Sequence, residues 1–323
     1  MFAEVILGRV SPKLDKVYHY SIPEKLIKEI KVGSQVLVPF GKAKSVGYIV
    51  GFVETSDVKG IKDIGEVLSP YPLFSEQSVE LARWMAEYYN CFFITALRMV
   101  MPPGTAHIEK RALKAKLRKP LYAQIPSSKS QIQNKFQIPK SKQRQFELTE
   151  EQKAALESIK TDVDKGKFSV SLLYGITASG KTEVYLRAVD HVIGKGGSAI
   201  ILVPEVGLTP QIIERFEAHF GEQLAVYHSE MPLKERQSVW AEVASGESMV
   251  VLGTRSAAFL SVNNLKLIVI DEEFENTYKQ EQNPRYHTRE VAFHIARKLD
   301  ASVVLGSGTP SIETYYNAEA GNY

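Results

Sequence analysis

Residues 175–182 read Gly-Ile-Thr-Ala-Ser-Gly-Lys-Thr. They follow an apolar run at 170–174, which is typical of a buried strand, and precede a segment from Glu183 whose apolar spacing is helical. Strand, glycine loop and helix with the spacing G-x-x-x-x-G-K-[ST] predict a phosphate-binding loop, in which backbone N–H groups surround phosphate oxygens. In such a loop Lys181 would reach the β and γ phosphates of a nucleotide, and Thr182 would hold Mg²⁺.

A pair of acidic residues indicates what happens to the nucleotide. The run 267–270 predicts a buried strand that ends at Asp271 and Glu272. Asp271 can complete the Mg²⁺ site, while Glu272 can orient or deprotonate the attacking water. Kinases of small molecules rarely need the adjacent glutamate, so the sequence predicts an ATP hydrolase with Lys181, Asp271 and Glu272 as catalytic residues. A solvated acidic strand end is the alternative.

The composition is that of an ordinary globular protein with unevenly placed charge. The 323 residues exceed what one hydrophobic core usually supports, which predicts at least two domains. The net charge is only +3, but residues 105–145 contain eleven Lys or Arg and a single acidic residue, Glu109. Cys91 is the only cysteine, which excludes an internal disulfide and a cysteine-cluster zinc site in this chain. No apolar run reaches membrane-spanning length, so we expect a cytoplasmic protein without a membrane partner.

Three regions follow from these patterns. Residues 1–104 are expected to form a small β-rich, barrel-like domain, because short β-branched and aromatic runs alternate with turn residues, and a helix is expected from Ser75. Residues 105–146 are rich in Gln, Ser, Lys and Pro and predict a linker, either a soluble tether or a non-specific phosphate contact. Residues 147–323 alternate strand and helix signals, which predicts an α/β domain with a doubly wound parallel sheet and helices on both faces.

Distinctive polar strings stand at the ends of the predicted strands. They occur at 203–211, 253–257, 278–289 and 306–311. Together with the phosphate loop, they have the order of the superfamily 2 helicase motifs. These strings, and Gly-Ser-Gln-Val-Leu-Val-Pro-Phe-Gly at 33–41, resemble the PriA family of bacterial primosomal replication-restart helicases, also called primosomal protein N′.

The resemblance implies an ATP-dependent 3′-to-5′ DNA helicase that binds stalled or branched forks and helps to reload the replicative helicase. It implies a 3′-DNA-end-binding domain at 1–104, a reduced or absent winged helix at 105–146, and the first RecA-like motor domain at 147–323. The cofactors would be ATP and Mg²⁺, with zinc expected in a family region whose cysteines this chain lacks. The partners would be DNA forks, single-stranded DNA, the single-stranded DNA-binding protein and other primosome proteins, and we expect a monomer.

The resemblance also implies site residues. The nucleotide site would comprise Gln152, Gly175, Ser179, Gly180, Lys181, Thr182 and Asp271, with Thr182 and Asp271 at the metal. Gln152 is placed to contact an adenine edge. DNA would contact Thr254, Arg255, Tyr278, Lys279, Arg285, Tyr286 and Arg289. In the loop formed by residues 278–289, Tyr286 offers a stacking face, and Arg285 and Arg289 offer phosphate partners. A pocket for the 3′ end would involve Tyr18, Gly33 and Lys62, with a core position for Tyr18 as the alternative.

Four features depart from the family pattern. Phe274 replaces a histidine that couples the carboxylates to the DNA loop, so coupling is expected to be weak or rewired. Gly308 replaces an alanine, and His19 replaces an aspartate of the 3′-end pocket. The chain also stops before the second motor domain, whose arginine contributes about 10³–10⁵ in rate, so slow hydrolysis is expected. One alternative is a non-catalytic fork-binding and primosome-docking module with a degraded ATPase, and another is a duplex translocase of the restriction-enzyme type.

Overall fold

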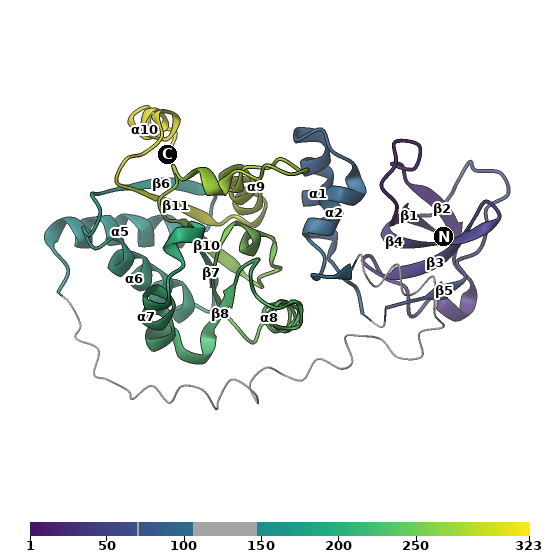
Figure 1. Ribbon diagram of the computed structural model, residues 1–323, viewed down its shortest axis with the longest axis horizontal. Helices are drawn as coiled ribbons and strands as arrows, with labels where there is room; N and C mark the ends of the chain where they lie inside the picture. The colour runs from purple at the N-terminus through teal and green to yellow at the C-terminus, as the bar shows by residue number, and fades with distance from the viewer. Residues whose placement is uncertain (70, 106–146) are drawn as a thin grey trace. The chain divides into compact units, whose positions relative to one another are not determined.

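The computed structural model describes residues 1–69, 71–105 and 147–323 (Figure 1). The linker predicted at 105–146 therefore lies outside the described residues, apart from Thr105. The described chain forms two compact units, one made by the residues up to 105 together with 281–285, and the other by 147–280 and 286–323. In these parts of the chain, no helix combines the length and apolarity needed to cross a bilayer.

The first unit is an antiparallel sheet followed by two helices. The sheet has the order β2-β1-β4-β3-β5. Its strands are β1 (Phe2–Leu7), β2 (Tyr18–Ser21), β3 (Gln35–Phe40), β4 (Ala43–Val53) and β5 (Glu66–Val67), with the short 3₁₀ helix η1 (Glu24–Leu26) after β2. The amide of Ser21 donates to the carbonyl of Lys62, and the carbonyl of Ser21 accepts from the amide of Ile64. These bonds join the edge strand β2 to the segment that precedes β5, the other edge strand. The sheet therefore bends in the way that the predicted barrel requires.

Two helices complete this unit. Helix α1 (Glu76–Tyr88) begins at Ser75, whose hydroxyl accepts from the amide of Ser78, as the sequence predicted. Helix α2 (Phe93–Met99) was not predicted, because its N-cap Phe92 carries no capping side chain.

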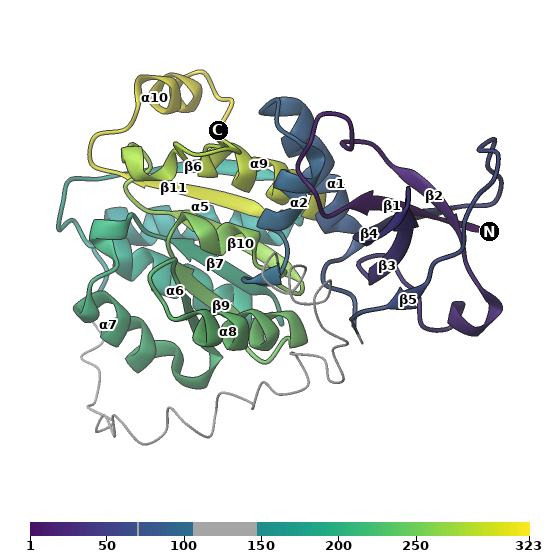
Figure 2. The same ribbon diagram turned by 45° about the vertical axis from the view of Figure 1, so that its right-hand side comes forward.

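The second unit is a parallel sheet of order β6-β11-β10-β7-β9-β8. Its strands are β6 (Ser169–Tyr174), β7 (Ser198–Leu202), β8 (Leu224–Tyr227), β9 (Val250–Gly253), β10 (Leu265–Ile270) and β11 (Ser302–Ser307). Its helices are α5 (Glu150–Lys165), α6 (Lys181–Gly194), α7 (Pro210–Phe220), α8 (Leu233–Ser245), α9 (Thr288–Leu299) and α10 (Ile312–Glu319). Short 3₁₀ helices are η3 (Glu205–Gly207), η4 (Gly221–Gln223), η5 (Arg255–Phe259) and η6 (Asn276–Tyr278). The predicted doubly wound α/β architecture is confirmed (Figure 2).

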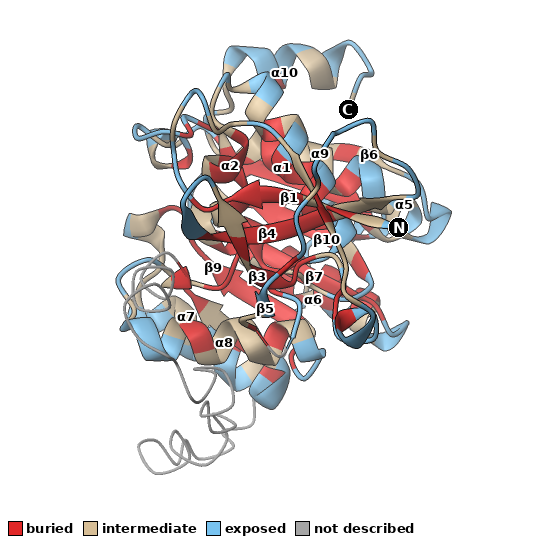
Figure 3. Ribbon diagram, turned by 90° about the vertical axis from the view of Figure 1, so that its right-hand side faces the viewer, coloured by how far each residue is buried: buried red, intermediate tan, exposed pale blue. Residues whose placement is uncertain are grey.

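Alternating side chains of the strands form two cores, one on each face of the sheet. Ile200 and Leu202 of β7 pack with Ala292 of α9 on one face. Ile201, between them in sequence, packs with Val189 of α6 on the other face. The central strands are buried along nearly their whole length, so both faces must be covered by helices (Figure 3).

The strand order brings the sequence motifs together. β11 pairs with β6 on one side and with β10 on the other, all three in parallel. The phosphate loop follows β6, the carboxylate pair follows β10, and the segment 308–311 follows β11. Because parallel strands end at the same edge of a sheet, the three segments meet there.

Candidate functional site

The phosphate loop links β6 to α6 and depends on its glycines. Gly180 has a φ of +84°, and a Cβ there would lie 2.4 Å from Nε2 of Gln152. A Cβ on Gly175 would lie 2.7 Å from Oγ of Ser179. Ala178 is also left-handed, with a φ of 64°. The loop is therefore tightly closed at the N-terminus of a 14-residue helix, where amide groups and the helix dipole favour an anion.

Lys181 turns its ammonium group back into this loop. Its Nζ donates to the carbonyl of Gly175 at 2.9 Å and to that of Ile176 at 3.4 Å, and the residue is only 8% exposed. Oε1 of Glu272 lies 3.4 Å from the same Nζ. The loop and the carboxylate motif thus face each other across this lysine.

Asp271 is held by a tyrosine of the helix after the phosphate loop. The hydroxyl of Tyr185 donates to Oδ1 of Asp271 at 2.9 Å. Burial raises the pKa of Asp271, and burial beside that carboxylate raises the pKa of Tyr185 well above 10, so the tyrosine remains a donor. A Cβ on Gly306 would lie 1.6 Å from the Tyr185 hydroxyl, so the neighbouring strand must have glycine at this point.

Glu272 points its second oxygen toward β11. Its backbone is left-handed, with a φ of 47°. Its Oε2 accepts from the amide of Gly308 at 3.5 Å. One carboxylate thus faces both Lys181 and the end of β11, and its action on an attacking water stays a prediction.

Gln152 contacts the phosphate loop through its side-chain amide. Thr149 and Gln152 form a capping box at the start of α5, in which Oε1 of Gln152 accepts from the amide of Thr149 at 3.0 Å. Its Nε2 donates to the carbonyl of Ser179 at 2.8 Å. The adenine contact stays a prediction; the amide has a second N–H and a second lone pair beyond these two bonds.

Thr182 and Asp271 supply oxygen ligands suited to Mg²⁺. Thr182 is the second residue of α6, and Asp271 follows β10. Within the ranges that the structure describes, no three His, Cys, Asp or Glu side chains gather as a metal site. Thr182 and Asp271 stay the predicted Mg²⁺ ligands, for an ion that nucleotide phosphates and water usually hold in large part.

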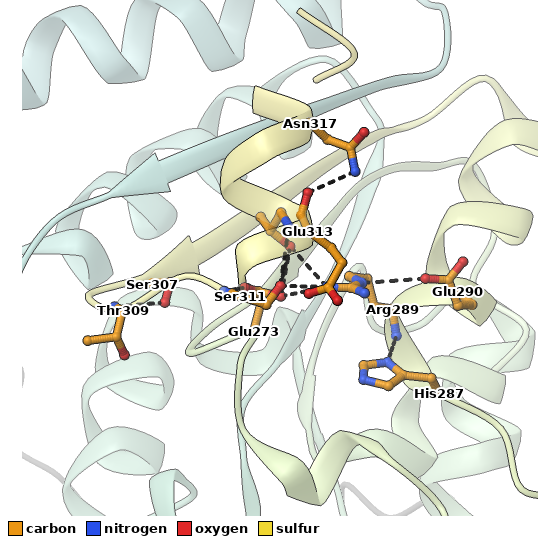
Figure 4. Close-up of polar contacts among 10 residues, drawn as sticks. Glu273, His287, Arg289, Glu290, Ser307, Thr309, Ser311, Glu313 and Asn317 are labelled. Carbon is orange, nitrogen blue, oxygen red and sulfur yellow. Dashed lines mark hydrogen bonds and ion pairs between the residues drawn. The ribbon is translucent and has the colours of Figure 1, made fainter. Parts of the chain in front are cut away.

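A buried ion pair ties the carboxylate motif to α9 and α10 (Figure 4). The Glu273 side chain is 0% exposed, and its Oε2 lies 2.9 Å from Nη1 of Arg289. The amide of Ser311 donates to Oε1 of Glu273 at 2.8 Å, and the hydroxyl of Thr314 donates to Oε2 at 3.1 Å. The guanidinium of Arg289 also donates to Thr314 at 2.9 Å. Arg289 is thus engaged inside the unit, and its contact with a DNA phosphate stays a prediction.

The aromatic residues of the predicted DNA loop are buried. Tyr278 is 1% exposed, and its hydroxyl donates to the carbonyls of Leu202 and Asp271 at 3.0 and 2.7 Å. Tyr286 is 1% exposed and packs edge to face on Phe259, with ring centroids 5.0 Å apart. The predicted stacking face of Tyr286 is therefore wrong for this conformation, because the ring belongs to the core.

The cationic residues of the same loop lie at its surface. Lys279 and Arg285 are both exposed. Nε of Arg285 donates to the carbonyl of Glu281 at 3.2 Å. Both side chains are accessible, and their contact with DNA stays a prediction.

Arg255, just after β9, donates hydrogen bonds to this loop. Its Nη1 donates to the carbonyls of Thr277 and Lys279 at 3.0 Å each, and its Nε lies 3.4 Å from Glu205. Thr254 is 3% exposed, and its hydroxyl is a buried oxygen without a hydrogen-bond partner among the described atoms. The predicted DNA contact of Thr254 is thus contradicted in this conformation by burial, while Arg255 remains at the surface edge.

The first unit contains a cavity of about 450 Å³. Tyr18 and Lys62 line it, as predicted, together with His19 and Gly41. Gly33 does not line it, which corrects the prediction. Gly33 is buried with a φ of +90°, and a Cβ there would lie 2.1 Å from the carbonyl oxygen of Phe74, so its role is backbone packing.

Gly41 is the pocket glycine that the sequence reasoning missed. It has a φ of +61°, a Cβ added to it would meet no atom within 4 Å, and Lys62 Nζ approaches its carbonyl at 3.5 Å. The sequence Pro-Phe-Gly at the end of β3 could have indicated this glycine. Phe40, directly before it, packs edge to face on Tyr18, with the ring centroids 5.4 Å apart.

Comparison with known proteins shows to which family the chain belongs. A family model described as DEAD/DEAH box helicase matches residues 149–318, more than half of the chain. The chain belongs to the DEAD/DEAH box helicases. A second model, described as a 3′DNA-binding domain, matches residues 4–102 of this helicase chain.

Curated relatives of this helicase chain are replication restart proteins PriA, so the resemblance seen in the sequence is confirmed. The protein of Bacillus subtilis (strain 168) is 30% identical over 441 residues, covering 100% of this chain and 55% of the relative. That of Treponema pallidum (strain Nichols) is 33% identical over 309 residues, covering 94% of this chain and 43% of the relative. The helicase chain thus spans about half the length of the curated relatives it matches.

Solved structures show weaker likeness. RecG bound to a three-way DNA junction aligns with a TM-score of 0.40 and 22% identity, over 55% of this chain and 23% of that chain. The DUF1998 helicase MrfA aligns with a TM-score of 0.40 and 20% identity, over 56% of this chain and 30% of that chain. At these scores, the fold assignment depends on the sheet order and the family model.

One buried histidine of the helicase unit is expected to make the stability of this unit depend on pH. Burial, with Arg289 and Lys279 nearby, lowers the pKa of His287 to about 4, and its Nδ1 accepts from the amide of Arg289 at the start of α9. The unfolded chain, with a pKa near 6.5, binds this proton more tightly, so stability falls as the pH drops from about 6.5 toward 4. We expect a loss of about 3 kcal/mol in the free energy of unfolding between pH 7 and pH 4, measured by urea titration. His287→Asn keeps a capping acceptor and should flatten this dependence; identical pH profiles for the two chains would contradict the assignment.

Proposed function

We propose that this chain belongs to an ATP-dependent DNA helicase of replication restart, which moves 3′ to 5′, binds stalled or branched forks and helps to reload the replicative helicase. The observation that carries the proposal is the approach of Lys181 to Glu272, 3.4 Å apart, in a helicase unit that follows a segment matched by a 3′DNA-binding domain model. The relatives named replication restart protein PriA support the pathway.

The residues of the site suit phosphate binding and hydrolysis. The N-terminus of α6 would bind the phosphates of ATP, and Lys181 would exchange the carbonyls of Gly175 and Ile176 for β and γ oxygens. Bound Mg²⁺, held by Thr182 and Asp271, would neutralise charge that develops on the transferred phosphoryl group. Glu272 would orient the attacking water and accept its proton.

We propose DNA forks and single-stranded DNA as the nucleic-acid partners, with the single-stranded DNA-binding protein and other primosome proteins as protein partners. A monomer in the cytoplasm fits this role. The proposed DNA contacts on the described chain are Lys279 and Arg255 in the helicase unit, and Tyr18, Lys62 and Arg285 in the first unit.

A non-catalytic fork-binding module is the second candidate, because Phe274 stands directly after the buried Glu273 and is 41% exposed. A phenyl ring cannot make the hydrogen bonds by which a histidine would couple the ATP site to DNA.

Single-turnover ATP hydrolysis with and without forked DNA distinguishes the two candidates. If the chain is a helicase motor, we expect slow ATP turnover that DNA accelerates. The substitution Glu272→Gln keeps the volume of the side chain and should abolish this turnover. Fork binding with no turnover in either chain would favour the second candidate. Strand displacement from duplexes with a 3′ or a 5′ tail tests the polarity, and displacement of only the 5′-tailed duplex would contradict it.

A further inference from the structure

Helix α6 carries a tyrosine that reaches the carboxylate of the predicted metal ligand Asp271. Tyr185 is 1% exposed, and its hydroxyl donates to Oδ1 of Asp271 at 2.9 Å. In the described part of the chain, Tyr185 is the side chain that hydrogen-bonds to this carboxylate. The bond joins α6, which follows the phosphate loop, to the end of β10. It therefore connects the two segments that the predicted Mg²⁺ site requires.

The same helix carries two further groups that the proposed ATP site needs. Lys181 and Tyr185 are four residues apart and thus lie on one face of α6, and Thr182 is the residue next to Lys181. The predicted Mg²⁺ ligands, Thr182 and Asp271, come from different segments of the chain. Through the Tyr185 hydroxyl, the helix that bears one predicted ligand can fix the side chain of the other.

Packing leaves the Tyr185 hydroxyl little freedom to move. Its sequence neighbours Val184 and Leu186 are also buried, at 1% and 2% exposed. On the adjacent strand β11, a Cβ added to Gly306 would lie 3.1 Å from Oδ1 of Asp271 and closer still to the hydroxyl. The donor and its acceptor thus both lie close to the backbone of β11. A preorganised donor of this kind can hold a metal-binding carboxylate in one orientation before the ion arrives.

We propose that Tyr185 is a positioning residue, whose hydroxyl orients the Asp271 carboxylate and thereby sets the affinity of the ATP site for Mg²⁺. The bond engages Oδ1 and leaves Oδ2 without a side-chain donor among the described residues, so Oδ2 is available to the ion. Removing the hydrogen-bond partner of a metal ligand typically weakens metal binding by about 10–100-fold. The inference rests on the proposed function, since it takes for granted that Asp271 binds the ion of a Mg²⁺–ATP complex.

The test is the affinity of Mn²⁺, a paramagnetic substitute for Mg²⁺, for the complex of the 323-residue chain with a fluorescent, non-hydrolysable ATP analogue. Electron paramagnetic resonance of free Mn²⁺ measures this affinity. Tyr185→Phe removes the hydroxyl and keeps the buried ring, and we expect it to weaken Mn²⁺ binding about tenfold. Its affinity for the analogue in excess EDTA should stay within about twofold of that of the unmodified chain, because the phosphate loop is unchanged.

Turnover gives a second measurement. The Mg²⁺ concentration that half-saturates single-turnover hydrolysis should rise about tenfold in Tyr185→Phe, while the rate at saturating Mg²⁺ should change by less than about threefold. Tyr227→Phe is the matched control, because it removes the hydroxyl of another buried tyrosine, which is 5% exposed and bonds to Arg236. Tyr227 belongs to β8, at the opposite edge of the sheet from β6, so this control should keep the Mn²⁺ affinity of the unmodified chain.

Three other results would overturn the role of Tyr185. Unchanged Mn²⁺ affinity in Tyr185→Phe would show that the bond only satisfies a buried carboxylate. A parallel loss of analogue binding in EDTA would show that the hydroxyl supports the whole site and not the carboxylate alone. An equal loss of Mn²⁺ affinity in Tyr227→Phe would reduce the effect to general destabilisation. If the unmodified chain binds no analogue with or without Mn²⁺, the proposed function fails and the inference fails with it.

Discussion

Replacing Lys181 by alanine is expected to abolish ATP turnover and to leave fork binding unchanged. The ammonium group of Lys181 is the one positive side chain seen to face both the phosphate loop and Glu272 among the described residues, through contacts of 2.9 Å to Gly175 and 3.4 Å to Glu272. Loss of one preorganised donor at a reacting centre costs about 10²–10³ in rate. Loss of a phosphate-binding cation adds to this. Single-turnover hydrolysis at saturating ATP measures the effect.

A lysine directly after the same helix controls for general effects. Lys195 follows α6 and pairs with Asp164 at the surface, so Lys195→Ala should leave turnover within about twofold. Binding of forked DNA by both variants is measured by anisotropy. Turnover by Lys181→Ala at the rate of the unmodified chain would contradict the nucleotide site, and loss of fork binding in this variant would contradict the separation of ATP and DNA functions.

Replacing Glu273 by alanine should lower the free energy of unfolding of the helicase unit more than any other substitution proposed for this unit. Its carboxylate is fully buried and accepts bonds from Arg289, Ser311 and Thr314. Glu273→Ala leaves the largely buried guanidinium of Arg289 without this partner, and breaking such a pair from one side costs about 3–5 kcal/mol. Urea unfolding followed by circular dichroism measures the loss.

The neighbouring glutamate provides the control. Glu290 also pairs with Arg289, at 3.4 Å, but its side chain is 35% exposed. Glu290→Ala should therefore cost less than about 1 kcal/mol. Equal losses in the free energy of unfolding from the two substitutions would show that burial does not decide how much the Glu273–Arg289 pair stabilises the unit.

The nucleotide site could be predicted from the sequence because its signals are local. The phosphate loop is one continuous string, and the strands before Gly175 and Asp271 are apolar runs of ordinary length. Parallel order then brings their ends to one edge of the sheet. The capping box at Thr149 is equally local, since both partners lie within four residues.

Burial of the DNA loop could not be predicted in this way. Tyr286 packs on Phe259, from a different segment of the chain, and Tyr278 donates to Leu202 from a different strand. Such tertiary contacts leave no periodic signal, and an aromatic residue beside cations has the same local pattern whether its ring is buried or exposed. The exchange of Gly33 for Gly41 has a similar origin, because both glycines have a positive φ and only their tertiary surroundings distinguish them.

The contact between Gly306 and Tyr185 constrains how this chain can diverge. A Cβ at position 306 would lie 1.6 Å from the tyrosine hydroxyl and 2.9 Å from the ring carbon that bears it. A larger residue at 306 is thus compatible only with a smaller residue at 185, and that exchange also removes the bond to Asp271. Among descendants of a common ancestor the two positions should change together or not at all, and each intermediate with a single change would pass through a weakened ATP site.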